Sequence, residues 1–192
     1  MLAEFSQTSS VGFTKAENRK GKDHDMSDVT ASSVSTTPVT SSADPDVAAA
    51  TAQFLTPIVT NLTALAVNGK QAHWHVRGIS FIAVHELLDD VVDHAQEYAD
   101  LAAERIVALG LPVDGRLETV ASTTTNPPLK AGFQQIDATI AGIVAQIDSA
   151  RASVQTAIDE LGEIDASSQD VAIEIARGLD KDRWFLTAHV SQ

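Results

Sequence analysis

The chain has 192 residues, of which 44% are hydrophobic and 5% aromatic, with no cysteine and a net charge of −13. The absence of cysteine excludes disulfides, thiolate ligands and thiol nucleophiles, so any bound metal must be held by nitrogen and oxygen atoms. The acidic balance opposes strong sequence-independent DNA binding, which depends on Lys and Arg meeting phosphates, and favours the attraction of cations.

Residues 1–44 are predicted to form a disordered tail, because Ser and Thr dominate residues 27–42 and the apolar residues follow no period. The tail lacks the apolar core of a signal peptide, and no apolar run approaches the roughly 20 residues of a membrane span. We therefore expect a cytoplasmic protein, with association with the nucleoid as an alternative.

Residues 45–192 are predicted to form an all-α domain, since apolar residues recur there at three- and four-residue spacings. Four helices are expected at about 46–75, 80–109, 131–161 and 168–190. Pro57 is expected to kink the first helix, and Ser167 or Ser168 to cap the fourth. A short extra helix is expected near 117–121. Four helices with a long connection between the second and third describe a ferritin-like bundle.

Two pairs of candidate metal ligands lie on the second predicted helix, His85 with Asp89 and Asp100 with Glu104. At about 100° per residue, all four fall within about a quarter of the helix circumference. Each pair has i, i+4 spacing, which makes its members neighbours that can chelate one ion. The pairs are about 22 Å apart along the axis. One helix therefore cannot bring both pairs to the same metal.

An antiparallel copy of this helix across a two-fold axis can close the site. If the axis passes near residues 93–95, His85 of one subunit faces Glu104 of the other, and the pairing repeats to give two equivalent sites. His73 is expected on the same side as His85. Two imidazoles with three carboxylates suit Fe(II), Mn or Zn. On spacing alone, a solvated acidic face with a core histidine is an equally open interpretation.

The same residues also resemble a known family. Residues 70–78, 81–89 and 100–105 read KQAHWHVRG, FIAVHELLD and DLAAER, and residues 179–185 read LDKDRWF. These segments resemble the Dps mini-ferritins, the DNA-binding proteins from starved cells, with similarity over about residues 46–190. The resemblance implies four-helix subunits that assemble into a hollow dodecamer and store iron as a ferric mineral.

The resemblance also implies the residues of the site. The metal ligands would be His73, His85 and Asp89 from one subunit, together with Asp100 and Glu104 from its two-fold mate. Trp74 matches a tryptophan beside the site, where it would act as an electron donor that quenches stray radical oxidation. The implied activity is a ferroxidase reaction, in which hydrogen peroxide or dioxygen oxidises Fe(II), with two iron ions per site.

The sequence departs from the family pattern at two places. Position 75 is His where many members have Asn, so His75 is either an additional ligand or a surface residue, and we favour the surface residue. The DNA-binding members carry tails rich in Lys and Arg, whereas the first 22 residues here hold four basic and two acidic residues. Protection of DNA by coating is therefore the alternative function, and weak DNA binding is expected.

Overall fold

The structure, a computed structural model, describes residues 43–190. This part of the chain forms four long helices and one short one: α1 (Pro45–His75), α2 (Phe81–Ala108), α3 (Leu117–Thr123), α4 (Ile136–Leu161) and α5 (Ala166–Ala188). Two strands of two residues each, β1 (Val76–Arg77) and β2 (Gln134–Gln135), pair in parallel. The predicted tail lies outside the described residues except for positions 43 and 44.

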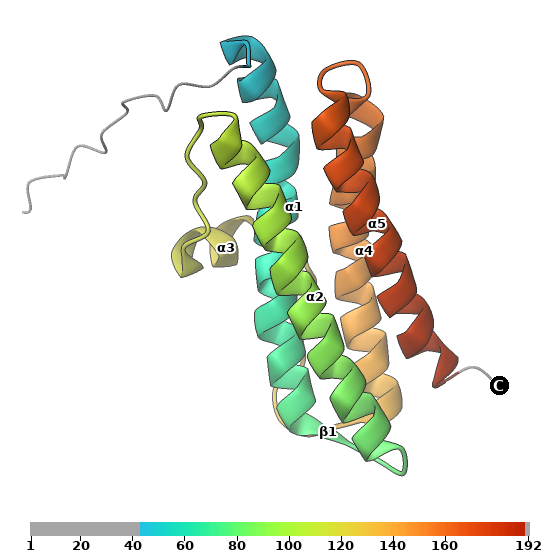
Figure 1. Cartoon of the computed structure of the whole chain (residues 1–192). Coiled ribbons are helices and arrows are strands. Elements are labelled where there is room, and N and C mark those ends of the chain that lie inside the picture. The colour runs from blue at the N-terminus through green and yellow to red at the C-terminus, as the bar shows by residue number, and fades with distance from the viewer. Residues whose placement is uncertain (1–42, 191–192) are drawn as a thin grey trace, which may run out of the picture. The chain divides into compact units, whose positions relative to one another are not determined.

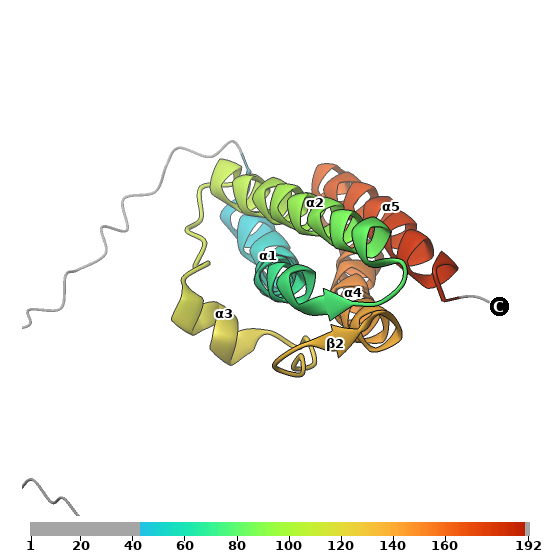
Figure 2. The same cartoon turned by 90° about the horizontal axis from the view of Figure 1, so that it is seen from below.

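The four long helices form a bundle in which α1 lies beside α2 and α4 lies beside α5 (Figure 1). A short turn joins α1 to α2, whereas the long connection from α2 to α4 carries α3 along the outside of the bundle (Figure 2). The connection ends in β2, which pairs with β1 and so ties the start of α4 to the end of α1. The four-helix bundle and the short extra helix confirm the predicted fold.

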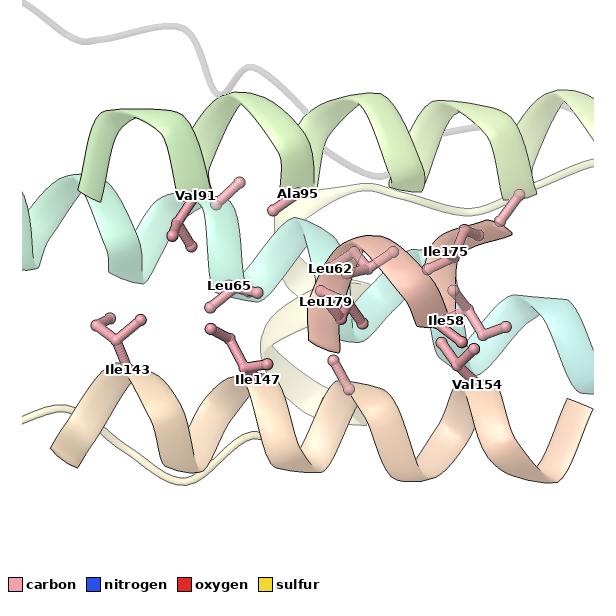
Figure 3. Packing of buried hydrophobic residues seen from close by; sticks show 14 of the residues in the cluster. Ile58, Leu62, Leu65, Val91, Ala95, Ile143, Ile147, Val154, Ile175 and Leu179 are labelled. Atoms are coloured by element: carbon pink, nitrogen blue, oxygen red, sulfur yellow. The ribbon is translucent and has the colours of Figure 1, made fainter. Parts of the chain in front are cut away.

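The core consists of apolar side chains, most of them branched, that meet between the helices (Figure 3). The labelled side chains come from all four long helices: Ile58, Leu62, Leu65, Val91, Ala95, Ile143, Ile147, Val154, Ile175 and Leu179. All of them are buried. Each Leu or Ile removed from water in this way contributes about 1.5–3 kcal/mol. Burial of one side of α2 leaves its opposite side for contacts outside the subunit.

The long connection is held to the bundle by the buried amide of Asn61 on α1. Its Oδ1 accepts from the Thr124 hydroxyl and from the Thr125 backbone N–H, both at 2.9 Å. Its Nδ2 donates to Thr125 Oγ1 at 3.0 Å and to Ser153 Oγ, on α4, at 2.8 Å. Asn61 therefore satisfies its polar atoms and fixes three segments against one another.

Two helix starts differ from the sequence prediction. The helix α4 begins at Ile136 rather than near 131, because Gly132 adopts a positive φ of 81° and the chain then pairs as β2. The cap of α5 is Asp165, whose carboxylate accepts from the Ser167 backbone N–H at 3.3 Å, so the prediction of a serine cap was wrong. Asp165 also binds Arg105 Nη2 on α2 at 2.6 Å, an additional partner that a serine could not hold as an ion pair.

The expectation that no segment approaches the length and apolarity of a membrane span was wrong for α1. This helix continues through Pro57, whose side chain is exposed. By length and composition alone it could cross a membrane, with a mean hydropathy of 1.3 over its most apolar window, but 56% of that window is buried inside the bundle. The same apolar residues therefore serve as the core of a four-helix bundle.

Candidate metal centre

The candidate ligands lie on the side of α2 that faces away from the core. Val84, Leu88 and Val91 are buried, whereas His85 and Asp89 are half-buried. Asp100 and Glu104, farther along the same helix, are exposed. Three of the predicted ligands, His73, His85 and Asp89, come together in the structure. We call these three residues the histidine half-site, and Asp100 with Glu104 the acidic half-site.

The two histidines of the half-site hold each other in position through two hydrogen bonds. The Nδ1–H of His73 donates to the backbone carbonyl of His85 at 2.8 Å, and the Nδ1–H of His85 donates to the carbonyl of His73 at 2.9 Å. The two rings are stacked, with centroids 3.6 Å apart and planes inclined by 22°. The Phe81 ring lies 4.9 Å from the His85 ring and packs beside it. These contacts join the last turn of α1 to the first turn of α2.

This arrangement decides which ring nitrogen of each histidine can bind a metal. A carbonyl oxygen only accepts hydrogen bonds, so Nδ1 of each neutral ring must carry the proton. The lone pair then lies on Nε2. Metal-binding histidines generally donate the other ring N–H to a carbonyl or carboxylate, which fixes the ring and its tautomer. His73 and His85 already have this second contact.

The carboxylate of Asp89 is held between the two helices. Its Oδ1 accepts from Lys70 Nζ at 2.5 Å and lies 3.1 Å from His73 Nδ1. The hydrogen bond from Lys70 holds the pKa of Asp89 below its ordinary value; burial opposes this shift, and the charges of His73 and Lys70 reinforce it. Asp89 is therefore ionised at neutral pH and available as an anionic ligand.

Lys70 was not predicted as a site residue. It lies three residues before His73 on α1, so the helical period places it beside His73 on the surface that meets α2. This three-residue spacing from His73 is the sequence feature that could have identified Lys70 as a site residue. The Lys70 ammonium group and a metal cation would compete for the same carboxylate.

Trp74 and His75, which follow His73 in the sequence, lie in surroundings that differ from those of His73. Trp74 is 61% exposed, although it directly follows His73. His75 Nδ1 donates to the Gln71 carbonyl at 2.9 Å, and its ring lies 5.3 Å from that of Phe133. The contacts of His75 are thus with α1 and the segment before β2 rather than with the histidine half-site, which favours its interpretation as a surface residue.

One subunit offers only part of a metal shell. Within residues 43–190, no group of three or more His, Asp or Glu side chains is arranged to hold a metal ion. Both histidines turn Nδ1 inward to carbonyls, and Asp89 is bound to Lys70. The acidic half-site stays about 22 Å away along α2. A metal bound at the histidine half-site would need ligands beyond those that residues 43–190 of its own subunit place beside it.

The family follows from comparison with known proteins. Residues 52–192 match the ferritin-like domain family. A DNA protection during starvation protein from Agrobacterium fabrum is 36% identical over 129 residues, which cover 67% of this chain and 80% of the relative. The chain belongs to the Dps family of ferritin-like proteins. This membership confirms the resemblance read from residues 70–105.

Solved Dps structures show the same subunit fold. The Dps of Microbacterium arborescens, in its high iron form, is 62% identical and superposes with a TM-score of 0.77 over 80% of this chain and 100% of that one. A Dps of Mycobacterium smegmatis is 28% identical, with a TM-score of 0.75 over 81% of this chain and 94% of that one. The helices that carry the two half-sites therefore have the Dps arrangement.

Proposed function

We propose that this protein is a ferroxidase that oxidises Fe(II) and stores the Fe(III) as a mineral inside a cage of identical subunits, a dodecamer in the cytoplasm, and so limits oxidative stress. The observation that carries the proposal is the pair of reciprocal Nδ1–H bonds between His73 and His85. They leave the lone pair of each ring on Nε2. Membership of the Dps family and similarity to a Dps in its high iron form support it.

In the proposed site, Fe(II) is the substrate and two subunits supply its ligands. His73, His85 and Asp89 come from one subunit, and Asp100 and Glu104 from its two-fold mate. Carboxylate oxygens are hard, anionic ligands that stabilise Fe(III) more than Fe(II), which favours electron release. Two Fe(II) ions supply the two electrons that convert one hydrogen peroxide and two protons into two waters. This stoichiometry avoids release of a hydroxyl radical.

Trp74 is proposed to protect the protein when an oxidising equivalent escapes from the iron pair. Its indole is electron-rich, directly follows the ligand His73 and is 61% exposed in the single subunit. The variant Trp74→Phe should oxidise Fe(II) at a near-normal rate and release more hydroxyl radical, measured by spin trapping. Unchanged radical release would remove Trp74 from the proposal and leave the ferroxidase intact.

The shared site is tested by mixing two inactive variants, His85→Ala and Glu104→Ala, after dissociation and reassembly. Each variant alone lacks one ligand in every site. A mixed dimer has one site with both changes and one site with neither, so random pairing should recover about a quarter of the wild-type sites. Peroxide-driven Fe(II) oxidation measures the recovery.

The control for this experiment is each variant dissociated and reassembled with itself, which should stay inactive. Assembly is verified by light scattering before the activity is read. If verified mixed assemblies regain no activity, ligands from two subunits do not share one site. If His73→Ala and Asp100→Ala both oxidise Fe(II) at the wild-type rate, the protein is a cage subunit without this ferroxidase site.

Coating of DNA is a second candidate function, favoured by the relatives named DNA protection during starvation protein. The net charge of −13 opposes it, since phosphate contacts require Lys and Arg. Weak binding is expected in a gel-shift assay at moderate salt. Tight binding that is lost on removal of residues 1–26, a segment that lies outside the described residues, would favour DNA coating instead.

A further inference from the structure

The outer side of α2 carries two exposed apolar side chains among its acids. Ile82 is 59% exposed and Val107 is 50% exposed. They lie at opposite ends of the helix, and at about 100° per residue they fall within about 20° of each other around it. They also share their side of the helix with Asp89, Asp100 and Glu104. An antiparallel second copy of α2 would remove both side chains from water.

Their positions are symmetric with respect to the two half-sites. Ile82 lies three residues before His85, and Val107 lies three residues after Glu104. In an antiparallel pair of α2 helices, the arrangement that sets His85 against the partner subunit's Glu104 therefore also sets Ile82 against the partner subunit's Val107. The same register therefore brings the proposed ligands of the two copies together and also brings their apolar side chains together.

The carboxylates on this side of α2 oppose the association of two copies. In this register Asp89 of one copy faces the partner subunit's Asp100, and carboxylates repel when no cation lies between them. Metal ions would neutralise this repulsion, but subunits must associate before iron arrives. Burial of Ile82 and Val107 supplies attraction that does not depend on metal.

We propose that Ile82 packs against the partner subunit's Val107 and that the two contacts, one at each end of the paired α2 helices, set the register that brings the half-sites together. The occupant of this side of α2 is thus a second copy of the chain. Ile82 and Val107 are positioning residues for the metal centre. The inference rests on the proposed function, because it takes its register from the shared site.

A hollow beside the acidic half-site supports this docking surface. It has a volume of about 340 Å³. Its walls come from α1, α2 and the connection that follows α2, and they are mostly small or apolar residues: Val59, Val67, Ala99, Asp100, Ala103 and Val113. Val67 is exposed at its rim. A concave apolar surface next to Asp100 can receive side chains that flank the partner subunit's histidine half-site, and burying it adds to the association.

The register can be tested directly because the chain has no cysteine. The double variant Ile82→Cys/Val107→Cys places two thiols about 37 Å apart on one straight helix. A disulfide requires Cα atoms within about 7 Å, so it can form only between subunits. Mild oxidation of the dilute, metal-free full chain should convert most of the protein to a covalently linked species on a non-reducing gel.

The matched control is Ile82→Cys/Gln96→Cys, because Gln96 is an exposed residue on the same side of α2 but about 16 Å from Val107 along the axis. It should yield little linked species, and so should each single-cysteine variant. Linking of the control pair with none of the first pair would show a different register and overturn the inference. Absence of linking in both pairs would also overturn it.

A charge exchange provides a second measurement that does not depend on thiol chemistry. Ile82→Lys and Val107→Glu alone should each weaken self-association of the metal-free protein by about ten-fold or more, because each buries an unpaired charge. Together they oppose Lys to Glu at both ends, and association should recover. Sedimentation velocity measures the effect, with circular dichroism to verify the fold. No recovery in the double variant would contradict the contact.

These readouts separate the inference from the proposed function, since neither uses iron. If the cysteine pair links and the charge pair recovers while the wild-type protein fails to oxidise Fe(II), the contact stands and the ferroxidase proposal fails. If the wild-type protein oxidises Fe(II) and the cysteine pair does not link, the ferroxidase stands and the contact is wrong.

Discussion

Lys70 Nζ donates to Asp89 Oδ1 at 2.5 Å, which means that a carboxylate proposed to bind iron is bound to a lysine. The lysine comes from α1 and the carboxylate from α2, so the contact also ties the two helices that carry the histidine half-site. Both side chains are about 40% exposed, at 40% and 42%. An incoming cation must therefore displace an ammonium group from a partly hydrated carboxylate.

The variant Lys70→Met should bind divalent metal more tightly. Removal of the ammonium group leaves Asp89 free for the metal, and its pKa returns toward the ordinary value near 4 without loss of ionisation at neutral pH. A partly exposed ion pair is worth up to about 1 kcal/mol, which corresponds to an increase in affinity of up to about five-fold. Calorimetric titration with Zn(II) measures it, with Lys130→Met as the surface control. Weaker binding in Lys70→Met would show that Lys70 supports the site.

The variant Asn61→Ala should lower the free energy of unfolding by about 2–4 kcal/mol. It removes the hydrogen bonds of the Asn61 amide to Thr124, Thr125 and Ser153 at once. The connection between α2 and α4 should then exchange its amide hydrogens faster. Urea unfolding and hydrogen exchange measure both effects. Asn68→Ala, which removes one hydrogen bond to Gln146, is the milder control.

The variant Gly178→Ala should destabilise the protein although alanine is the better helix former. A Cβ at Gly178 would lie 2.0 Å from the Tyr98 hydroxyl oxygen, which means that the phenol of α2 rests directly on the backbone of α5. Overpacking of this kind costs about 1–3 kcal/mol. In a Tyr98→Ala background the same change should be neutral or stabilise by up to about 1 kcal/mol. Equal effects in both backgrounds would contradict the contact.

Asp182 predicts a dependence of stability on pH. It is 2% exposed, accepts from His94 Nδ1 at 2.9 Å, and its Oδ2 has no partner among the described residues. Burial raises the pKa of Asp182 above its ordinary value, and His94 only partly opposes the shift. The folded state therefore holds this proton more tightly than the unfolded state. The stabilisation is present below about pH 4 and is lost as the pH rises through the folded pKa.

The variant Asp182→Asn removes this titration. The unfolding free energy of the wild type minus that of the variant should therefore fall as the pH rises from about 4 toward neutrality. Urea unfolding at several pH values measures the difference. Asp170→Asn, at an exposed position of α5, should show no comparable trend. A difference that rises with pH would mean that the His94–Asp182 ion pair outweighs the burial of the carboxylate.

The sequence by itself determined the four helices, the outward side of α2 and the residue types available for metal. A helix repeats every 3.6 residues, so the spacing of Val84, Leu88 and Val91 fixes the core side and places His85 and Asp89 away from it. The same arithmetic separates the two half-sites by about 22 Å. Boundaries set by contacts were less predictable: the start of α4 depends on pairing of β2 with β1.

Only the tertiary structure determined the hydrogen-bond partners of the residues in the histidine half-site. No spacing rule indicates that His73 and His85 donate to each other's carbonyls, because that depends on how the end of α1 crosses the start of α2. The same crossing brings Lys70 to Asp89. Periodicity along one helix determines which side a residue faces, whereas the partner on that side comes from a distant segment and is selected by packing.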